Sequence, residues 1–215
     1  QLDRRVVITF AIGLILSIAL AFLYDKGEIL LWINGHENWW VARVFHTLTD
    51  FGGHLAYLVA IGIGLVIRSR YAVASAINGL LTLFLSGYLK SIFETPRPAL
   101  WLRGQGVDET EMFAFGTFLQ PSFDSFPSGH AMAAFSLYGF CALVSKTVWA
   151  QSLWLLLATC IAFSRLYLGF HFLQDIVFGA IIGLGIALLG YALQGKLIGK
   201  NGWGDAGLSS MLRIK

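Results

Sequence analysis

Long apolar runs constrain this chain more than any other feature of its sequence. Six of them follow one another, at 6–24, 54–67, 71–92, 128–145, 148–168 and 172–193. Most approach the roughly 20 apolar residues that a helix needs to cross a bilayer. Because the hydrocarbon core offers no partner for backbone polar groups, each run is expected to be a helix. The sequence therefore predicts an all-α, polytopic membrane protein with six transmembrane helices.

The composition supports a membrane protein and no second domain. Hydrophobic residues make up 57% of the chain and charged residues only 13%, whereas an ordinary soluble domain carries about 25% charged residues. The runs use almost all of the 215 residues, so a single membrane-embedded domain over 1–215 is expected. The net charge of +3 does not indicate nucleic-acid binding. Cys141 and Cys160 lie inside apolar runs, without the spacing of a metal site, and are expected to be free.

The segment between the first two runs has a different pattern. Residues 26–49 mix Trp32, Trp39 and Trp40 with charged side chains. Tryptophan settles at the boundary between lipid and water. The segment is therefore predicted to form a helix that lies in the membrane interface.

The lysines and arginines predict the orientation of the protein. One side of the six runs holds Arg4, Arg5, Arg68, Arg70, Lys146, Lys196, Lys200, Arg213 and Lys215. The other side holds Lys26, Arg43, Lys90, Arg97, Arg103 and Arg165. Cytoplasmic loops carry the excess of positive charge, so both termini and the short turns are predicted to be cytoplasmic. The small size favours a bacterial inner membrane.

Three polar clusters interrupt the apolar pattern. They are Lys90 through Arg97-Pro98, the sequence Pro-Ser-Gly-His at 127–130, and Ser164-Arg165 through His171 and Asp175. Ionisable groups in or beside apolar spans are costly and indicate function. With six alternating spans, all of these clusters fall on the same, non-cytoplasmic face. The sidedness therefore predicts one shared site.

The cations of this site suit a phosphate group. Arg97 and Arg165 offer planar forks of donors to phosphate oxygens, and Lys90 adds a mobile charge. Ser128 is placed to cap the start of a helix, whose free N–H groups attract anions. Gly129 lets the backbone approach a ligand closely.

The remaining ionisable groups suit covalent catalysis. His171 and Asp175 are four residues apart and share one helix face. A carboxylate beside an imidazole orients it and stabilises its charged form, which leaves the other ring nitrogen free to attack phosphorus. His130 is placed to protonate the departing oxygen and then to activate water. The cations make a metal unnecessary, and neither a metal nor another cofactor is expected.

Each cluster also has an ordinary explanation when it is taken alone. Lys90 resembles a membrane anchor, and Arg97-Pro98 resembles a loop turn. Pro-Ser-Gly at 127–129 resembles a helix start without any chemistry. The pair His171 and Asp175 could be a structural hydrogen bond or half of a metal site. Their common sidedness favours a joint function over these separate explanations.

The complete set of motifs, K-x6-R-P, P-S-G-H and S-R-x5-H-x3-D, resembles the signature of the type 2 phosphatidic acid phosphatase superfamily. That superfamily includes membrane lipid phosphate phosphatases and soluble vanadium haloperoxidases. The resemblance implies that His171 is the nucleophile, Asp175 its orienting partner and His130 the general acid. It also implies that the phosphate is held by a further set of residues: Lys90, Arg97, Ser128, Gly129 and Arg165.

The expected function is hydrolysis of lipid phosphates or pyrophosphates at the outer face of the membrane. Polyprenyl pyrophosphate, phosphatidylglycerol phosphate, phosphatidic acid and lipid A are the substrates considered. Transfer of the phosphate to an acceptor lipid remains an alternative, because it shares the first half-reaction. A non-catalytic lipid transporter is a further alternative, which needs no His171–Asp175 pair. The segment 99–126 is a hypothetical lid that admits the lipid tail beside the site.

Overall fold

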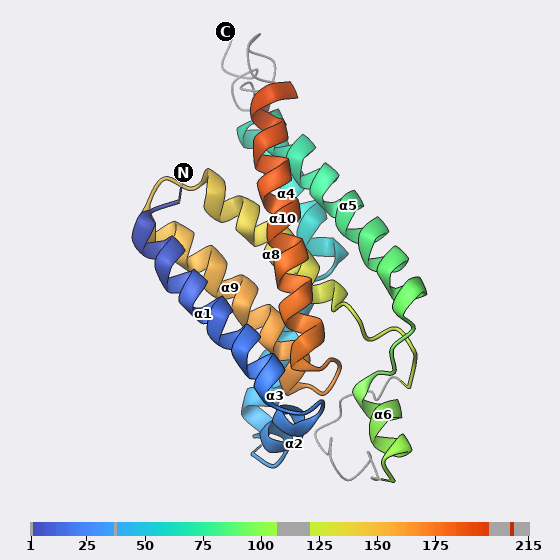
Figure 1. Cartoon of the computed structure of the whole chain (residues 1–215). Helices are drawn as coiled ribbons and strands as arrows, with labels where there is room; N and C mark the ends of the chain where they lie inside the picture. Colours follow the sequence, from blue (N-terminus) through green and yellow to red (C-terminus); the bar gives the residue numbers. More distant parts are fainter. Residues whose placement is uncertain (1, 37, 107–120, 198–206, 209–215) are drawn as a thin grey trace, which may run out of the picture.

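The computed structural model describes residues 2–36, 38–106, 121–197 and 207–208, and within these ranges the regular elements are all helices. The fold class is therefore all-α across the described part of the chain. The helices, shown in Figure 1, are α1 (Arg4–Leu23), α2 (Glu28–Asn34), α3 (Trp39–Asp50), α4 (His54–Ile67), α5 (Ser69–Phe93), α6 (Pro98–Gly104), α8 (Gly129–Val144), α9 (Val148–Tyr167) and α10 (Leu173–Leu197).

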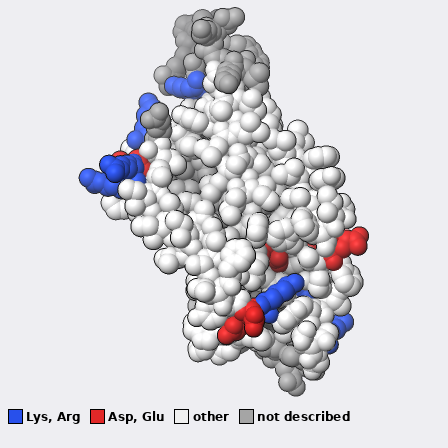
Figure 2. Space-filling view, viewed as in Figure 1, with Lys and Arg blue, Asp and Glu red and all other residues white. Residues whose placement is uncertain are grey.

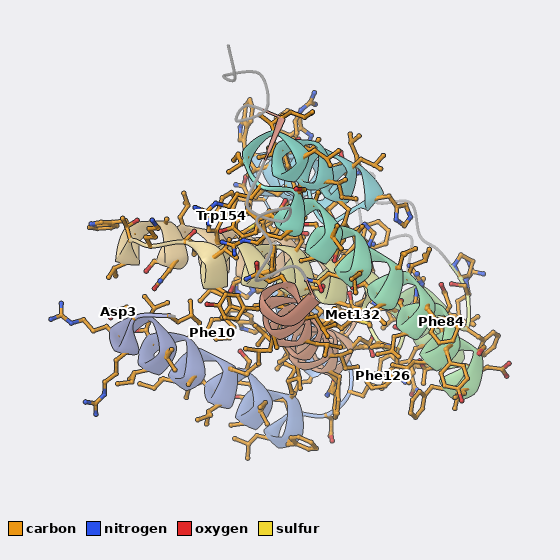
Figure 3. All side chains as sticks on the ribbon, turned by 90° about the horizontal axis from the view of Figure 1, so that it is seen from above. Asp3, Phe10, Phe84, Phe126, Met132 and Trp154 are labelled. Carbon is orange, nitrogen blue, oxygen red and sulfur yellow. The ribbon has the colours of Figure 1, made fainter. Side chains whose placement is uncertain are left out.

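Helix α8 is the centre of the bundle. It packs against α5, α9 and α10, and 12 of its 16 residues are buried. In Figure 3, Met132 of α8 points into the middle of the bundle, whereas Phe84 of α5 points away from it. Met132 is fully buried and Phe84 is 70% exposed. The apolar residues of the outer helices thus face the lipid, and α8 supplies the core.

Two glycines of α10 allow it to lie close to α8. An added Cβ atom at Gly179 would come within 2.7 Å of the Ser128 carbonyl oxygen. At Gly183 the added atom would come even closer to the Met132 carbonyl oxygen. Small residues of this kind let two helix backbones approach in a membrane. The close contact fixes the position of α10 along the axis of α8. The start of α8 holds part of the predicted site.

Each of the six predicted runs forms a helix with nearly the predicted bounds, and the run at 54–67 coincides with α4. Within the described residues, four candidate spans stand alone by length and composition: α1, α9, α10 and the stretch Ser69–Gly104 that begins with α5. A fifth is formed by α3 and α4 if that bent pair counts as one span. Helix α8 has 16 residues and is about 24 Å long, less than the hydrocarbon thickness. Since α8 is enclosed by other helices, its length does not have to match the lipid. A count of six spans stays a prediction.

The segment 26–49 forms two helices, α2 and α3, where the sequence predicted one. Gly35 ends α2, and the side chain of Asn38 accepts a hydrogen bond from the Trp40 N–H at the start of α3. The chain then bends by 52° between α3 and α4. The break between α2 and α3 arises because a glycine and a capping asparagine lie between two short apolar stretches. The interfacial position of this segment stays a prediction.

Charged side chains lie at the two ends of the bundle. Figure 2 shows lysine, arginine and the acidic residues near these ends, with a broad uncharged belt between them. The start of α1 and the end of α10 lie at one end, and α2, α3 and α6 lie at the other (Figure 1). Both cysteines are free, as predicted. This distribution identifies an integral membrane protein, while its orientation stays a prediction.

Candidate active site

The predicted site residues come from five places in the chain that meet at one end of the bundle. Lys90 lies in the last turn of α5, and Arg97 lies directly before α6. Ser128 caps α8, Arg165 lies in the last turn of α9, and Asp175 lies in the first turn of α10. His130 experiences the charges of Arg165, His171, Lys90 and Arg97. The structure therefore brings the three sequence clusters together.

His171 and Asp175 form a buried pair at the start of α10. His171 is 1% exposed and Asp175 is 4% exposed. The Nδ1 atom of His171 lies 3.5 Å from Oδ2 of Asp175, which is longer than an ordinary N–H···O hydrogen bond. A contact between an imidazole and a carboxylate shortens when positive charge develops on the imidazole. With Nδ1 directed at the carboxylate, Nε2 remains as the nitrogen that can attack.

The surroundings keep His171 neutral. Burial lowers the pKa of His171 to about 4, and the cations Arg165 and Arg97 act in the same direction. The Asp175 carboxylate opposes this shift. A neutral imidazole has a free lone pair, so His171 is in the protonation state that a nucleophile requires.

Asp124 neutralises two of the predicted phosphate-binding cations. It accepts hydrogen bonds from Nε and Nη2 of Arg97 at 2.8 and 3.1 Å, and Lys90 Nζ lies 3.4 Å from its Oδ2 atom. Partial burial would raise the pKa of Asp124, but hydrogen bonds from Arg97 and Ser122 outweigh it and hold this pKa well below its usual value. The carboxylate is therefore ionised and occupies the donors that phosphate needs.

Sequence reasoning did not include Asp124 in the site. This residue lies three positions before Pro127, inside the segment that was considered only as a lid. An acidic residue so close to the Pro-Ser-Gly-His motif was the available signal. Its pairing with Lys90 and Arg97 depends on how the segments before and after 107–120 come together.

Arg165 is held from three directions. Its Nη1 atom donates to Oγ1 of Thr49 at 2.8 Å, which ties α9 to α3. Its guanidinium lies 4.0 Å from the centre of the Phe170 ring. Its carbonyl oxygen accepts from the N–H groups of Phe170 and His171 at 2.9 and 3.1 Å. The contacts of its side chain fix the position of the Arg165 guanidinium. The contacts of its carbonyl oxygen fix the turn that carries His171.

The start of α8 is anchored to α10 and packed against α5. The Ser128 N–H donates to the Asp175 carbonyl oxygen at 3.0 Å, and the Ser128 side chain accepts from the Ala131 N–H. An added Cβ atom at Gly129 would lie 3.0 Å from Oγ of Ser86. The glycine therefore lets α5 approach the helix start, and His130 follows one residue later.

The arrangement can bind a phosphate group and attack it. Lys90, Arg97 and Arg165 supply positive charge, and the start of α8 adds backbone donors. His171 and His130 supply two imidazoles beside these cations. Among the residues that the structure describes, no group of three or more His, Cys, Asp or Glu side chains has the arrangement of a metal site. Half of the hypothetical lid at 99–126 lies outside the described residues, because 107–120 are not among them.

Comparison with known proteins places this site in a family. The sequence model described as the PAP2 superfamily matches residues 55–198. YbjG of Escherichia coli (strain K12), provisionally named an undecaprenyl-diphosphatase, is 29% identical over 121 residues, which is 56% of each chain. The bacitracin transport permease protein BcrC of Bacillus licheniformis is 38% identical over 76 residues, which is 34% of this chain and 36% of that protein. The chain thus matches about half or less of the length of these relatives.

Two solved structures share the fold. Aquifex aeolicus LpxE aligns with a TM-score of 0.66 and 22% identity, over 78% of this chain and 94% of that one. The PAP2 type phosphatidylglycerolphosphate phosphatase of Bacillus subtilis aligns with a TM-score of 0.60 and 23% identity, over 86% of this chain and 96% of that one. At these identities the likeness concerns the fold.

Proposed function

Because this chain belongs to the PAP2 superfamily, we propose that it is an integral membrane enzyme that hydrolyses lipid phosphates or diphosphates at the outer face of a bacterial inner membrane. The observation that carries the proposal is the buried pair of His171 and Asp175 beside Lys90, Arg97 and Arg165. A buried nucleophile next to a cluster of cations suits attack on an anionic phosphorus centre.

The first step transfers the phosphoryl group to the enzyme. Nε2 of His171 forms a bond to phosphorus, and the bond from phosphorus to the departing oxygen breaks. Burial and the neighbouring cations disfavour the charged form of His130, and the negative charge of the bound phosphate favours it. The protonated His130 gives its proton to the departing oxygen, so the lipid leaves as an alcohol or, from a diphosphate, as a monophosphate. Asp175 stabilises the positive charge that develops on the His171 ring.

The second step restores the enzyme. His130, now neutral, takes a proton from water, and the water oxygen forms a bond to phosphorus. The bond from phosphorus to Nε2 of His171 breaks, and inorganic phosphate leaves. Lys90, Arg97 and Arg165 stabilise the negative charge on the phosphoryl oxygens in both steps. Since these residues neutralise that charge, we propose that the reaction needs no metal ion.

The names of two relatives suggest the substrate. YbjG is named for undecaprenyl diphosphate, and the Bacillus subtilis structure is that of a phosphatidylglycerolphosphate phosphatase. Both names describe a phosphate ester or diphosphate joined to a long apolar tail. We propose that this enzyme takes the same class of substrate, with a polyprenyl diphosphate as the first compound to test.

Two alternatives to hydrolysis are a phosphotransferase and a transporter. A phosphotransferase would use the same His171 intermediate but would pass the phosphate to an acceptor lipid. A transporter is suggested only by the name of BcrC, and transport has no use for the His171–Asp175 pair. Product analysis with and without an acceptor lipid separates the first alternative from hydrolysis.

The test is phosphate release by the purified protein in detergent with EDTA, from a panel of polyprenyl diphosphate, phosphatidylglycerol phosphate, phosphatidic acid and lipid A. His171→Ala should abolish release. His36→Ala is the matched control, because this exposed histidine follows α2 and its ring contacts the Trp32 carbonyl oxygen of that helix, and it should keep wild-type activity. No release from any substrate, or full activity in His171→Ala, would refute the proposal.

A further inference from the structure

Ser125 lies behind the catalytic pair and belongs to none of the three sequence motifs. Its side chain is fully buried. Its hydroxyl donates to Oδ2 of Asp175 at 2.5 Å. The same oxygen accepts from the Phe172 N–H at 3.0 Å and is the one that lies 3.5 Å from Nδ1 of His171. Three groups therefore meet at one carboxylate oxygen.

The backbone around Ser125 is itself fixed. The Ser125 N–H donates to the Thr95 carbonyl oxygen at 3.0 Å, and the Phe126 N–H donates to Oγ1 of Thr95 at 2.9 Å. The Arg97 N–H donates to the Ser122 carbonyl oxygen at 2.9 Å. Residues 122–126 thus run antiparallel beside 95–97. This pairing places Ser125, which is not part of α10, against Asp175 of that helix.

We propose that Ser125 is a positioning residue of the reaction, which acts on His171 through Asp175. The inference rests on the proposed function in that it assigns His171 as the nucleophile. By holding Oδ2, Ser125 prevents rotation of the carboxylate and keeps one oxygen aimed at Nδ1 of His171. The Phe172 N–H contributes a second anchor from the backbone of the same turn.

The hydrogen bond also sets how strongly the carboxylate acts on the imidazole. A donated O–H withdraws part of the negative charge from Oδ2. His171 is faced by Asp175 from α10, by Arg165 from α9, by Arg97 from the segment before α6 and by His130 from α8. Asp175 is the one carboxylate in this set, so a change in its charge distribution acts directly on the protonation of His171.

Loss of the Ser125 hydroxyl has two consequences, one for kcat and one for the pH dependence of kcat/KM. Release of the carboxylate misplaces His171 and slows the chemical step, which lowers kcat with little change in KM. The carboxylate also regains the charge that Ser125 withdrew, and it then stabilises the imidazolium form more strongly. The acid limb of kcat/KM should therefore move to higher pH. A side chain that only fills space would produce no such shift.

The experiment compares Ser125→Ala with Ser125→Thr in the full-length protein. Ser125→Ala should lower kcat about tenfold or more, leave KM within about twofold, and shift the acid limb to higher pH. Ser125→Thr keeps the hydroxyl and should restore both readouts toward wild type. Ser91→Ala is the control, because within the described residues the exposed Ser91 hydroxyl bonds only the Tyr88 carbonyl oxygen of its own helix.

A second measurement needs no turnover. The pKa of His171, followed by NMR of labelled histidine and assigned by the signal missing in His171→Ala, should be higher in Ser125→Ala than in wild type. An unchanged pKa, or a lower kcat with an unshifted acid limb, would overturn the role of Ser125. Absence of phosphate release from wild type would instead refute the proposed function, and the NMR titration would still decide the role of Ser125.

Discussion

Arg97 and Asp124 form a two-point ion pair, in which Nε and Nη2 of the guanidinium donate to the two carboxylate oxygens at 2.8 and 3.1 Å. This fork geometry is the one by which arginine binds phosphate. Lys90 contacts the same carboxylate. Asp124 therefore stands where an anionic substrate would meet both cations, and substrate binding has to displace or share this carboxylate.

Asp124→Asn should strengthen the binding of anions. The substitution removes one negative charge beside Lys90 and Arg97 while the shape of the side chain is kept. Because Asp124 is partly exposed, solvent limits the gain to about 1 kcal/mol, or about fivefold in affinity. Inhibition by inorganic phosphate should become tighter by this factor, and KM should fall. Both are measured by steady-state kinetics.

The matched control is Glu94→Gln, which removes an exposed carboxylate at the end of α5. It changes the net charge equally but has no part in the Arg97 fork. A similar gain in both variants would show that overall charge is responsible. Weaker phosphate binding in Asp124→Asn would show that Asp124 holds the cations in place for the substrate.

The activity should persist in moderate acid. The pKa of His171 lies near 4, below the ordinary value of 6.5, so the imidazole stays neutral as the pH falls through 6.5. We expect kcat/KM to fall only as the pH approaches about 4. Unfolding restores the ordinary pKa of His171, so the folded state loses stability as the pH falls from 6.5 toward 4. A pH profile with an acid limb near 6.5 or above would contradict the expectation.

Thr49→Val should weaken the site although α3 lies outside the region that matches the family model. The nearly isosteric valine removes the hydrogen bond to Nη1 of the buried Arg165. Loss of a hydrogen bond to a charged group costs about 1.5 kcal/mol, which corresponds to about tenfold in kcat/KM. Thr47→Val is the control, since the exposed Thr47 hydroxyl donates to the Arg43 carbonyl oxygen of its own helix and has no other hydrogen bond to the part of the chain that the structure describes. Equal kinetics in the two variants would remove Thr49 from the site.

Gly183→Ala should destabilise the bundle. The new methyl group would collide with the Met132 carbonyl oxygen of α8 and lie 3.0 Å from the Cβ atom of Phe135. Forcing two packed helices apart costs about 1–3 kcal/mol. Gly185→Ala is the control in the same helix, because nothing lies within 4 Å of its added Cβ atom. Thermal unfolding in detergent should show a lower midpoint for Gly183→Ala alone.

The sequence predicted one shared site because the apolar runs impose alternation across a membrane, and the structure brings the three clusters together. Six runs placed Lys90, His130, Arg165 and His171 at the same face before any tertiary contact was known. The same reasoning missed Asp124, Ser125 and Thr49. None of these lies in a recognisable motif, and each enters the site through a segment without hydrophobic periodicity or through an outer helix.

The sequence by itself determined the helices of the bundle, since hydrocarbon permits only segments that satisfy their own backbone hydrogen bonds. It also determined which charged residues share an end of the bundle. Tertiary structure decided which partners those charges have: Asp124 for Arg97, Ser125 for Asp175 and Thr49 for Arg165. These pairs are separated by 27, 50 and 116 residues along the chain. Such contacts depend on how the helices and their connecting segments pack together. The local spacing of residues along the chain does not predict them.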